Sequence, residues 1–200
     1  MTDNFAAKAA GWDSPEKIKM TDTFVNEVKK RVRPDKTMKV LEVGAGTGLV
    51  GLKLLPDVNL VVFVDTSEAM LKVLKSKTSA KDNIEIVHGE VLDYLKNNID
   101  LIVSNMAFHH IPDIEGTLEH LYKICNANAK IIVSDLMSED GSFHNYEAVP
   151  HQGFDPEKLS ETFRKVGFTK VENYVYNTLK REKHDGKMHH YDQFILFATR

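Results

Sequence analysis

Hydrophobic positions follow two patterns along this chain. Short, nearly continuous apolar runs are typical of buried strands, and longer stretches with apolar residues every three or four positions are typical of amphipathic helices. Strands are predicted near residues 39–43, 60–64, 84–88, 99–104, 130–134, 169–178 and 191–198. Helices are predicted near residues 15–32, 48–55, 67–77, 114–125 and 156–166.

The alternation of strands and helices predicts an α/β fold. We expect a doubly wound, Rossmann-like, seven-stranded and mostly parallel sheet, with helices on both faces and an antiparallel C-terminal strand. The last two strands are expected to pair through a turn near Asp185-Gly186. Ser14-Pro15 is typical of a helix start, and Gly167 is typical of a helix end. Ligands of such folds lie at the carboxyl ends of the parallel strands.

The most specific feature is the glycine-rich segment LEVGAGTGL at residues 41–49. Gly44, Gly46 and Gly48 occupy alternate positions between an apolar strand and a helix. Glycine adopts positive φ and lets a ligand lie against the main chain. The helix that follows offers free N–H groups and the positive end of its dipole. The segment therefore predicts a nucleotide-type binding loop at the edge of the sheet.

The charge and register of this loop favour one kind of nucleotide. The dinucleotide pattern G-x-G-x-x-G fits Gly46, Gly48 and Gly51 only in a poor register, because its first glycine should close the strand, as Gly44 does. Glu42 would repel a pyrophosphate. A carboxylate there suits S-adenosylmethionine, which has an ammonium group, a sulfonium and no phosphate.

Asp65 ends the second predicted strand, about 20 residues after Gly44. In a β-α-β unit, such a carboxylate accepts hydrogen bonds from the ribose hydroxyls. NAD would use the same acid, so Asp65 supports an adenosyl ligand without choosing between the two. The alternative interpretation makes Asp65 the N-terminal cap of the next helix.

Four segments carry a resemblance to a known family: LEVGAGTG, VVFVDTSEAML, IEIVHGEVLDY and IDLIVSNMAFHHIPD. They resemble the class I S-adenosylmethionine-dependent methyltransferases, in particular the small-molecule enzymes related to the ubiquinone and menaquinone methyltransferases. The resemblance covers residues 35–136 strongly and 137–200 in layout. The family often has aspartate after the glycine of the third segment, where this chain has Glu90. The main-chain amide of Val91 is therefore an alternative contact for the adenine.

These arguments together predict a donor site. Its expected members are Trp12, Glu42, Gly44, Ala45, Gly46, Gly48, Asp65, Thr66, Met70, Gly89, Glu90, Val91 and Asn105. Trp12 and Phe5 belong to a segment before the first helix that is expected to close over the donor and expel water. The alternative is that Trp12 only anchors the helix. Asn105 is not followed by two prolines, which weighs against methylation of nucleobase amino groups.

The candidate catalytic residues are histidines. His109 and His110 follow the fourth strand, and an imidazole can take a proton from an attacking hydroxyl or amine. One of the two is expected to face the pocket and the other to be structural. His151 is a third candidate, in the irregular stretch 138–153 after the fifth strand. With His144 these histidines offer metal-ligand chemistry. We nevertheless expect no metal, because methyl transfer does not require one and the ligand spacing is loose.

Composition is that of an ordinary globular protein. Hydrophobic residues make up 42% and charged residues 28% of the 200 positions, which predicts one domain, residues 1–200, with residues 1–34 as an N-terminal helical lid segment. The net charge is −3 and no basic patch stands out, so a nucleic-acid partner is disfavoured. The single cysteine, Cys125, allows no intrachain disulfide and is expected in the core. No membrane-length apolar run or signal peptide appears, so we expect a cytoplasmic protein without membrane insertion.

The expected function is transfer of a methyl group from S-adenosylmethionine to a small-molecule acceptor. An NAD-dependent dehydrogenase and a non-catalytic S-adenosylmethionine-binding protein are the alternatives. The sequence specifies neither the acceptor, nor whether oxygen, nitrogen, sulfur or carbon is methylated, nor the oligomeric state.

Overall fold

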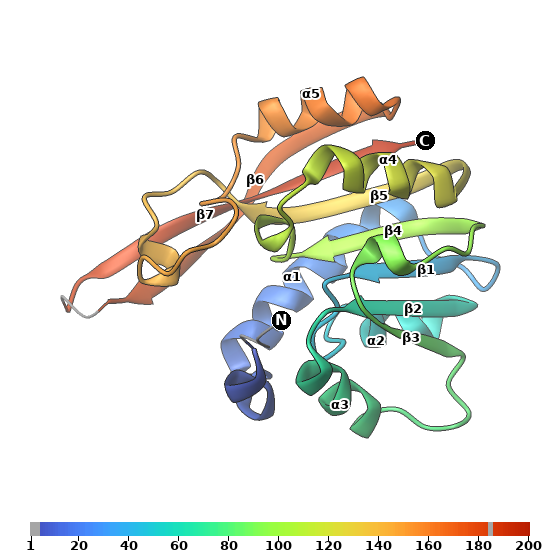
Figure 1. Ribbon diagram of the computed structural model, residues 1–200, viewed down its shortest axis with the longest axis horizontal. Helices are drawn as coiled ribbons and strands as arrows, with labels where there is room; N and C mark the ends of the chain where they lie inside the picture. Colours follow the sequence, from blue (N-terminus) through green and yellow to red (C-terminus); the bar gives the residue numbers. More distant parts are fainter. Residues whose placement is uncertain (1–4, 184–185) are drawn as a thin grey trace.

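A computed structural model of the chain describes residues 5–183 and 186–200. Within these residues seven strands form one sheet, in the order β3-β2-β1-β4-β5-β7-β6 (Figure 1). The strands are β1 Lys39–Val43, β2 Leu60–Asp65, β3 Ile84–His88, β4 Ile99–Asn105, β5 Cys125–Leu136, β6 Thr169–Glu182 and β7 Met188–Thr199. β1 to β5 are parallel, and β7 is antiparallel to both β5 and β6. The predicted fold class is confirmed.

Helices connect the strands and cover both faces of the sheet. The α-helices are α1 Pro15–Val32, α2 Gly51–Leu54, α3 Glu68–Ser76, α4 Ile114–Ile124 and α5 Pro156–Val166. The 3-10 helices are η1 Ala6–Gly11, η2 Leu55–Asp57, η3 Val91–Asp93, η4 Phe108–His110 and η5 Ser142–His144. The start of α1 is as predicted, because the Ser14 side chain accepts a hydrogen bond from the Lys17 amide. None of the described helices is long and apolar enough to span a bilayer.

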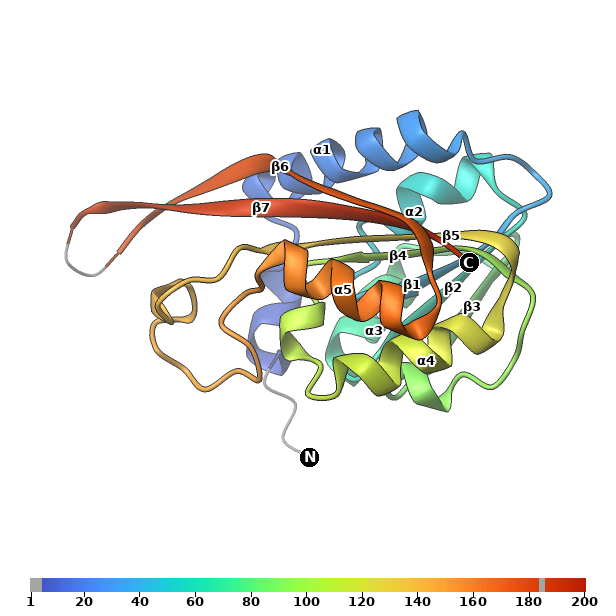
Figure 2. The ribbon, with the colours of Figure 1, turned by 90° about the horizontal axis from the view of Figure 1, so that it is seen from above.

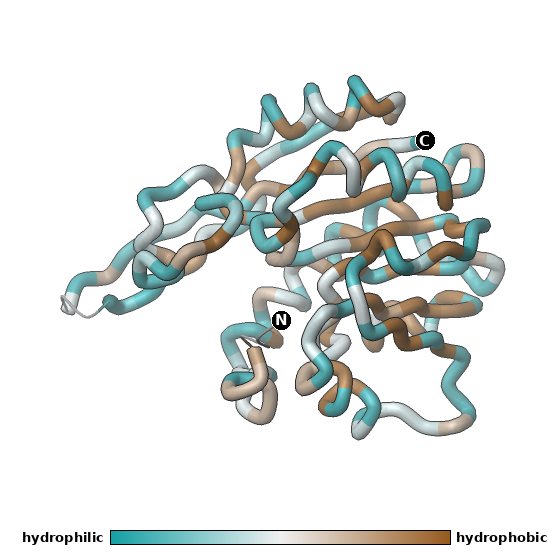
Figure 3. Tube along the Cα trace, viewed as in Figure 1, coloured by the Kyte–Doolittle hydropathy of each residue, from teal (hydrophilic) through white to brown (hydrophobic). Residues whose placement is uncertain are grey.

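Helices lie on both faces of the sheet (Figure 2), and a hydrophobic layer separates them from the sheet on each face. In one layer, α1, α2 and α3 pack on the sheet through side chains such as Phe24 and Leu74. In the other layer, α4 and α5 pack through side chains such as Leu121 and Phe163. These four side chains are completely buried, and burying each contributes about 1.5–3 kcal/mol. Hydropathy along the chain follows this arrangement, with the central strands the most apolar segments (Figure 3).

Three predicted boundaries are wrong. The helix expected over 48–55 has only one α-helical turn and continues as η2, where Pro56 lacks an amide hydrogen to donate. Cys125 begins β5 instead of ending a helix, although it is buried as expected. His189 and His190 precede the strand predicted near 191–198, but they belong to β7 because they pair with β6. The turn itself includes residue 185, which lies outside the described residues.

The parallel strands bring their carboxyl ends to one edge of the sheet. Asp65 at the end of β2 is the register partner of His88 at the end of β3. The Gly44 amide donates to the Val64 carbonyl at 2.9 Å, and the Gly89 amide donates to the Asp65 carbonyl at 3.0 Å. Asn105 ends β4, which is parallel to β1. Gly44, Asp65, Gly89 and Asn105 therefore share one edge, as predicted.

Candidate active site

The glycine loop adopts a conformation that other residues rarely adopt. Gly44, Gly46 and Gly48 have φ values of 68°, 53° and 78°, all in the left-handed region. A Cβ atom on Gly44 would also collide with the Cβ atom of Ala107, which follows β4. The alternating glycines therefore allow both the path of the loop and its close approach to the exit of β4.

Asp65 joins the loop to the end of β2. The Gly46 amide donates to Oδ2 of Asp65 at 2.6 Å, and the Ser67 amide donates to Oδ1 at 2.8 Å. The cap of α3 is Ser67, whose side chain accepts a hydrogen bond from the Met70 amide. The structure therefore does not make Asp65 the cap, and its carboxylate lies at the glycine loop.

Glu42 lies beneath the loop and is only 3% exposed. Its Oε2 accepts a hydrogen bond from the Gly51 amide at 2.8 Å. Burial raises the pKa of the Glu42 carboxyl to about 8, and the hydrogen bond from Gly51 opposes that rise. The carboxyl group thus ties β1 to the first residue of α2, at the far side of the loop.

The segment before α1 lies over the same loop. The Lys17 ammonium is 3.1 Å from the centre of the Trp12 ring. A Cβ atom on Gly46 would be 3.8 Å from Nε1 of Trp12, so this ring is close to the loop backbone. The Thr47 hydroxyl donates to the Asp13 carboxylate at 2.5 Å. The sequence analysis predicted a role for Trp12, but no local pattern indicated the hydrogen bond between Asp13 and Thr47.

The remaining donor residues lie near the ends of β2, β3 and β4. Thr66 is exposed and Met70 is buried in the first turn of α3. The Glu90 amide donates to the Asp93 carboxylate at 2.8 Å, which forms the turn that buries Val91. The side-chain oxygen of Asn105 is buried and has no hydrogen-bond partner among the described residues.

His109 is held rigidly by Asp135, a residue that the sequence analysis missed. Nδ1 of His109 is 2.6 Å from Oδ1 of Asp135, and the His109 amide donates to Oδ2 at 3.1 Å. Both side chains are buried. With the proton on Nδ1, the lone pair of Nε2 is free, and Nε2 has no hydrogen-bond partner within the described part of the chain. The sequence signal that could have identified Asp135 is its position as an acidic residue near the end of a predicted apolar strand.

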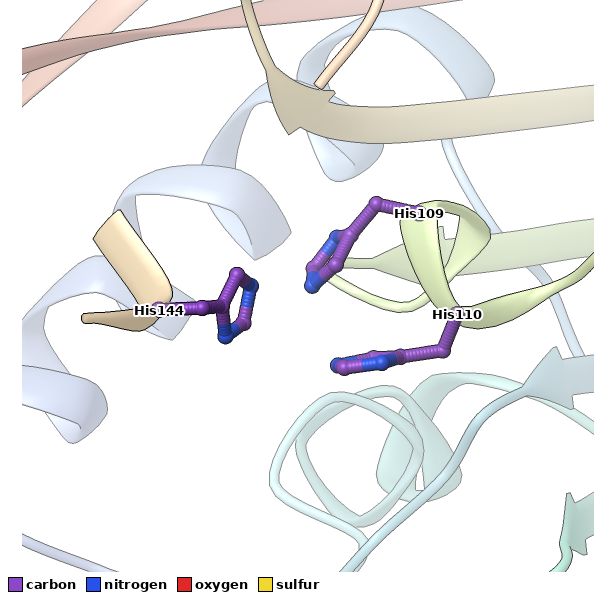
Figure 4. Close-up of side chains that lie close together, drawn as sticks. All are labelled: His109, His110 and His144. Atoms are coloured by element: carbon purple, nitrogen blue, oxygen red, sulfur yellow. The ribbon is translucent and has the colours of Figure 1, made fainter. Parts of the chain in front are cut away.

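The rings of His110 and His144 gather around His109 (Figure 4). The ring centroid of His109 is 4.1 Å from that of His110 and 4.9 Å from that of His144. Burial lowers the pKa of His110 to about 3 and that of His144 to about 4, and the neighbouring histidines add to both shifts. His110 and His144 are therefore neutral at physiological pH.

The loop that carries His144 is fixed by the β6–β7 hairpin, which extends beyond the rest of the sheet (Figure 1). The Phe143 ring packs against Tyr191 of β7 with centroids 5.1 Å apart, and the Arg181 guanidinium lies 3.7 Å from the centre of the Phe143 ring. The hydroxyls of Ser142 and Tyr191 are 2.8 Å apart. These contacts hold His144, in the stretch 138–153, beside His109 at the exit of β4.

His151 lies next to this cluster but is not part of it. Its Nε2 is 3.0 Å from the Ile111 carbonyl, and its amide donates to the His109 carbonyl at 3.2 Å. Its ring packs beside Phe154. His151 therefore supports the backbone around η4.

The Phe5 ring lies between Trp12, at the glycine loop, and His110, in the histidine cluster. Its ring centroid is 5.7 Å from that of Trp12 and 5.2 Å from that of His110, in edge-to-face geometry. The segment before α1 thus contacts the neighbourhood of the glycine loop at one end and the histidines at the other.

Comparisons with known proteins agree with this geometry. Residues 41–131 match the sequence model of a family described as "Methyltransferase domain". The chain is 28% identical to the demethylmenaquinone methyltransferase of Staphylococcus aureus over 52% of this chain and 47% of that protein. It is 29% identical to malonyl-[acyl-carrier protein] O-methyltransferase 2 of Ilyobacter polytropus over 64% of this chain and 50% of that protein. The chain therefore spans about half the length of these curated relatives.

Among solved structures, the chain resembles a SAM-dependent methyltransferase from Aquifex aeolicus. The TM-score is 0.71 at 20% identity, and the likeness covers 97% of each chain. This likeness extends the shared fold over nearly the whole chain, including the parts outside the family match.

Proposed function

We propose that this chain, which carries a methyltransferase domain of the class I S-adenosylmethionine-dependent type, transfers a methyl group from S-adenosylmethionine to a small-molecule acceptor. The observation that carries the proposal is the left-handed glycine loop joined to Asp65 at the carboxyl edge of the sheet. The family match over residues 41–131 confirms the resemblance that the motifs predict. It favours methyl transfer over the NAD-dependent dehydrogenase.

In the proposed complex, the donor lies along the glycine loop, with its ribose at the Asp65 carboxylate. Glu42 stabilises the loop from beneath through its hydrogen bond to Gly51. Gly89, Glu90 and Val91 would contact the adenine from the end of β3. Trp12 would cover the donor from the segment before α1, which supports a lid role for residues 5–14 of the predicted lid segment 1–34, whereas α1 itself packs on the sheet.

The acceptor would lie at the exit of β4, beside the histidines. A lone pair on the acceptor attacks the methyl carbon, the bond from sulfur to that carbon breaks, and its electron pair stays on the neutral thioether. Most of the rate enhancement would come from holding the two reactants in line and away from water. Of the three predicted catalytic histidines, His109 is the one with an oriented ring and a free nitrogen, so we assign His109 to the acceptor side.

The names of the relatives support a small or acyl acceptor, since one methylates demethylmenaquinone and another a malonyl group on a carrier protein. The net charge of −3 supports the absence of a nucleic-acid partner. A single buried cysteine suits a reducing compartment, so we propose a cytoplasmic location.

A turnover assay tests the proposal against a non-catalytic binding protein. The purified chain is incubated with S-adenosylmethionine and a panel of hydroxyl, thiol, amine and quinol compounds, and S-adenosylhomocysteine is quantified. Release that depends on one acceptor class supports the enzyme. Tight donor binding with no release for any acceptor, including those of the named relatives, favours the non-catalytic alternative.

A further inference from the structure

Three histidines from two distant segments offer nitrogen atoms to one small volume. His109 and His110 come from η4, and His144 comes from η5, which the β6–β7 hairpin holds in place. One ring nitrogen from each lies within 4.8 Å of the other two. Figure 4 shows the three rings converging from opposite sides of this volume.

Two of these nitrogens are buried and unused. Nε2 of His109 and Nε2 of His144 have no hydrogen-bond partner among the described residues. A buried polar atom without a partner costs about 1–3 kcal/mol. Two such atoms that face the same volume therefore indicate a ligand that accepts their lone pairs.

Asp135 gives His109 the environment of a metal ligand. Metal-bound histidines usually donate their second ring N–H to a carboxylate, which fixes the tautomer and the ring orientation. Nδ1 of His109 is 2.6 Å from the Asp135 carboxylate, and both residues are almost fully buried. The same carboxylate supplies a negative charge near the cluster, which partly offsets the positive charge of Arg181.

We propose that His109, His110 and His144 bind a divalent transition-metal ion of the zinc type, with an open position for an oxygen or sulfur atom of the acceptor. Three imidazole ligands plus one exchangeable position are typical of catalytic zinc. Ligands at about 2.0–2.1 Å from a tetrahedral ion are about 3.3 Å apart, so nitrogens that lie within 4.8 Å of one another must approach by up to about 1.5 Å to close around the ion.

The role of the ion rests on the proposed methyl transfer. An acceptor hydroxyl or thiol that binds the ion loses its proton to solvent more easily, because the positive charge stabilises the anion. The resulting anion attacks the methyl carbon, the sulfur keeps the electron pair of the broken bond, and neutral S-adenosylhomocysteine leaves. His109 is then a ligand, and the ion takes over the activation of the acceptor.

A general base formed by His109 alone would explain fewer of these contacts than a metal site does. Proton abstraction needs only His109 and Asp135, and leaves His110 without a role. Nor does it explain why the anchored loop brings His144 to within 4.9 Å of the His109 ring. The metal site uses all three side chains.

A metal titration tests the proposal directly. The untagged 200-residue chain is stripped with a chelator, and zinc binding is measured in competition with a chromophoric chelator. We expect one zinc ion per chain, and a cobalt(II) spectrum with the intense visible bands of a four-coordinate ion. His144→Ala and His109→Ala should each weaken binding at least 100-fold, and Asp135→Asn should weaken it about 10- to 100-fold.

His190→Ala and His88→Ala are the matched controls, because each removes an exposed histidine outside the cluster. Both should retain one ion per chain with near wild-type affinity. The proposal is wrong if the wild type binds no zinc in the micromolar range, or if His190→Ala weakens binding as much as His144→Ala. Circular dichroism and thermal melting of each variant identify any that do not fold. His144→Gln provides a second ligand deletion should His144→Ala not fold.

Titration of S-adenosylhomocysteine in the same samples separates this proposal from the methyltransferase assignment. Donor binding should be the same in stripped wild type and in His144→Ala. Donor binding without zinc binding overturns the metal site alone. Zinc binding without donor binding overturns the proposed methyl transfer and leaves the metal site in place.

Discussion

The Gly46 amide donates a 2.6 Å hydrogen bond to Oδ2 of Asp65. This bond fixes the glycine loop after β1 to the end of β2, although the two residues belong to different strand–helix units. Oδ1 of the same carboxylate accepts from the Ser67 amide. Asp65 is thereby held in one orientation at the edge where the ribose of the donor is expected, so its carboxylate needs little reorganisation to bind.

Removing the Asp65 carboxylate should weaken donor binding. Asp65→Ala should lose about 1.5–3 kcal/mol of binding free energy for S-adenosylhomocysteine, or roughly 10- to 150-fold in Kd, because a charged acceptor to the ribose hydroxyls is lost. Isothermal titration calorimetry measures it. Glu68→Ala is the control, since Glu68 is a nearby exposed acid that pairs with Lys72 on α3. Equal affinity in Asp65→Ala and Glu68→Ala would show that Asp65 does not bind the donor.

A side chain in the glycine loop should abolish donor binding. Gly46→Val forces a β-branched residue to φ 53° and fills space between the loop and Trp12. Gly186→Val is the matched control, because Gly186 also has positive φ, 72°, but has open space around it in the hairpin. Both variants carry a similar backbone cost, so only Gly46→Val should lose binding. A folded Gly46→Val protein that binds S-adenosylhomocysteine normally would refute the loop assignment.

Glu42 predicts a pH dependence of stability in the ligand-free protein. Burial raises its pKa from 4.5 to about 8, so between these values the folded state binds a proton that the unfolded state releases. The stabilisation of the folded state by this proton is complete below about pH 4.5 and is lost as the pH rises through about 8. Urea unfolding of wild type and Glu42→Gln between pH 5 and 8 should therefore show wild type losing stability relative to the variant. A pH-independent difference would contradict the raised pKa.

The segment before α1 should become better protected when the donor binds. It contacts the glycine loop through Trp12 and through the hydrogen bond between Thr47 and Asp13, so a bound ligand would add contacts to it. Hydrogen exchange of residues 5–14 with and without S-adenosylhomocysteine measures the change. Residues 1–4, which precede this segment, lie outside the described residues. Equal protection in both states would leave Trp12 as an anchor of α1.

His109 should act on the acceptor and not on the donor. Once an acceptor is known, His109→Ala should lower turnover about 10²–10⁴-fold, whether His109 takes the proton or holds the ion that activates the acceptor. The Kd for S-adenosylhomocysteine should stay nearly unchanged. Asp135→Asn should reduce turnover less and should alter its pH profile, because Asp135 orients the His109 ring. Wild-type turnover in both variants would exclude the pair from catalysis.

The sheet was predictable because local pattern and tertiary structure agree in its strands. β1 and β3 occupy the residues expected from their apolar runs, and α1 begins at the cap that Ser14 provides. The errors fall where tertiary packing decides the boundary. β6 and β7 continue to pair with each other beyond the end of β5, so both strands are longer than predicted. His189 therefore belongs to a strand, although the polar sequence around it did not predict one.

The site was only partly predictable for a related reason. The glycine loop and Asp65 are defined by short-range spacing, so the sequence contains them. The contact of His144 with His109 depends on a loop that Phe143 and Tyr191 anchor to a hairpin far along the chain. Asp135 belongs to β5, and the sequence separation between Asp135 and His109 does not indicate that the two side chains are in contact. Such contacts need the three-dimensional arrangement.

The most direct measurement of the central claim is a calorimetric titration of the wild-type chain with S-adenosylhomocysteine and, separately, with NAD. The account predicts one site with a micromolar Kd for S-adenosylhomocysteine, and no heat of binding with NAD. Absence of heat with S-adenosylhomocysteine and with S-adenosylmethionine, or saturable binding of NAD at the same loop, would contradict it.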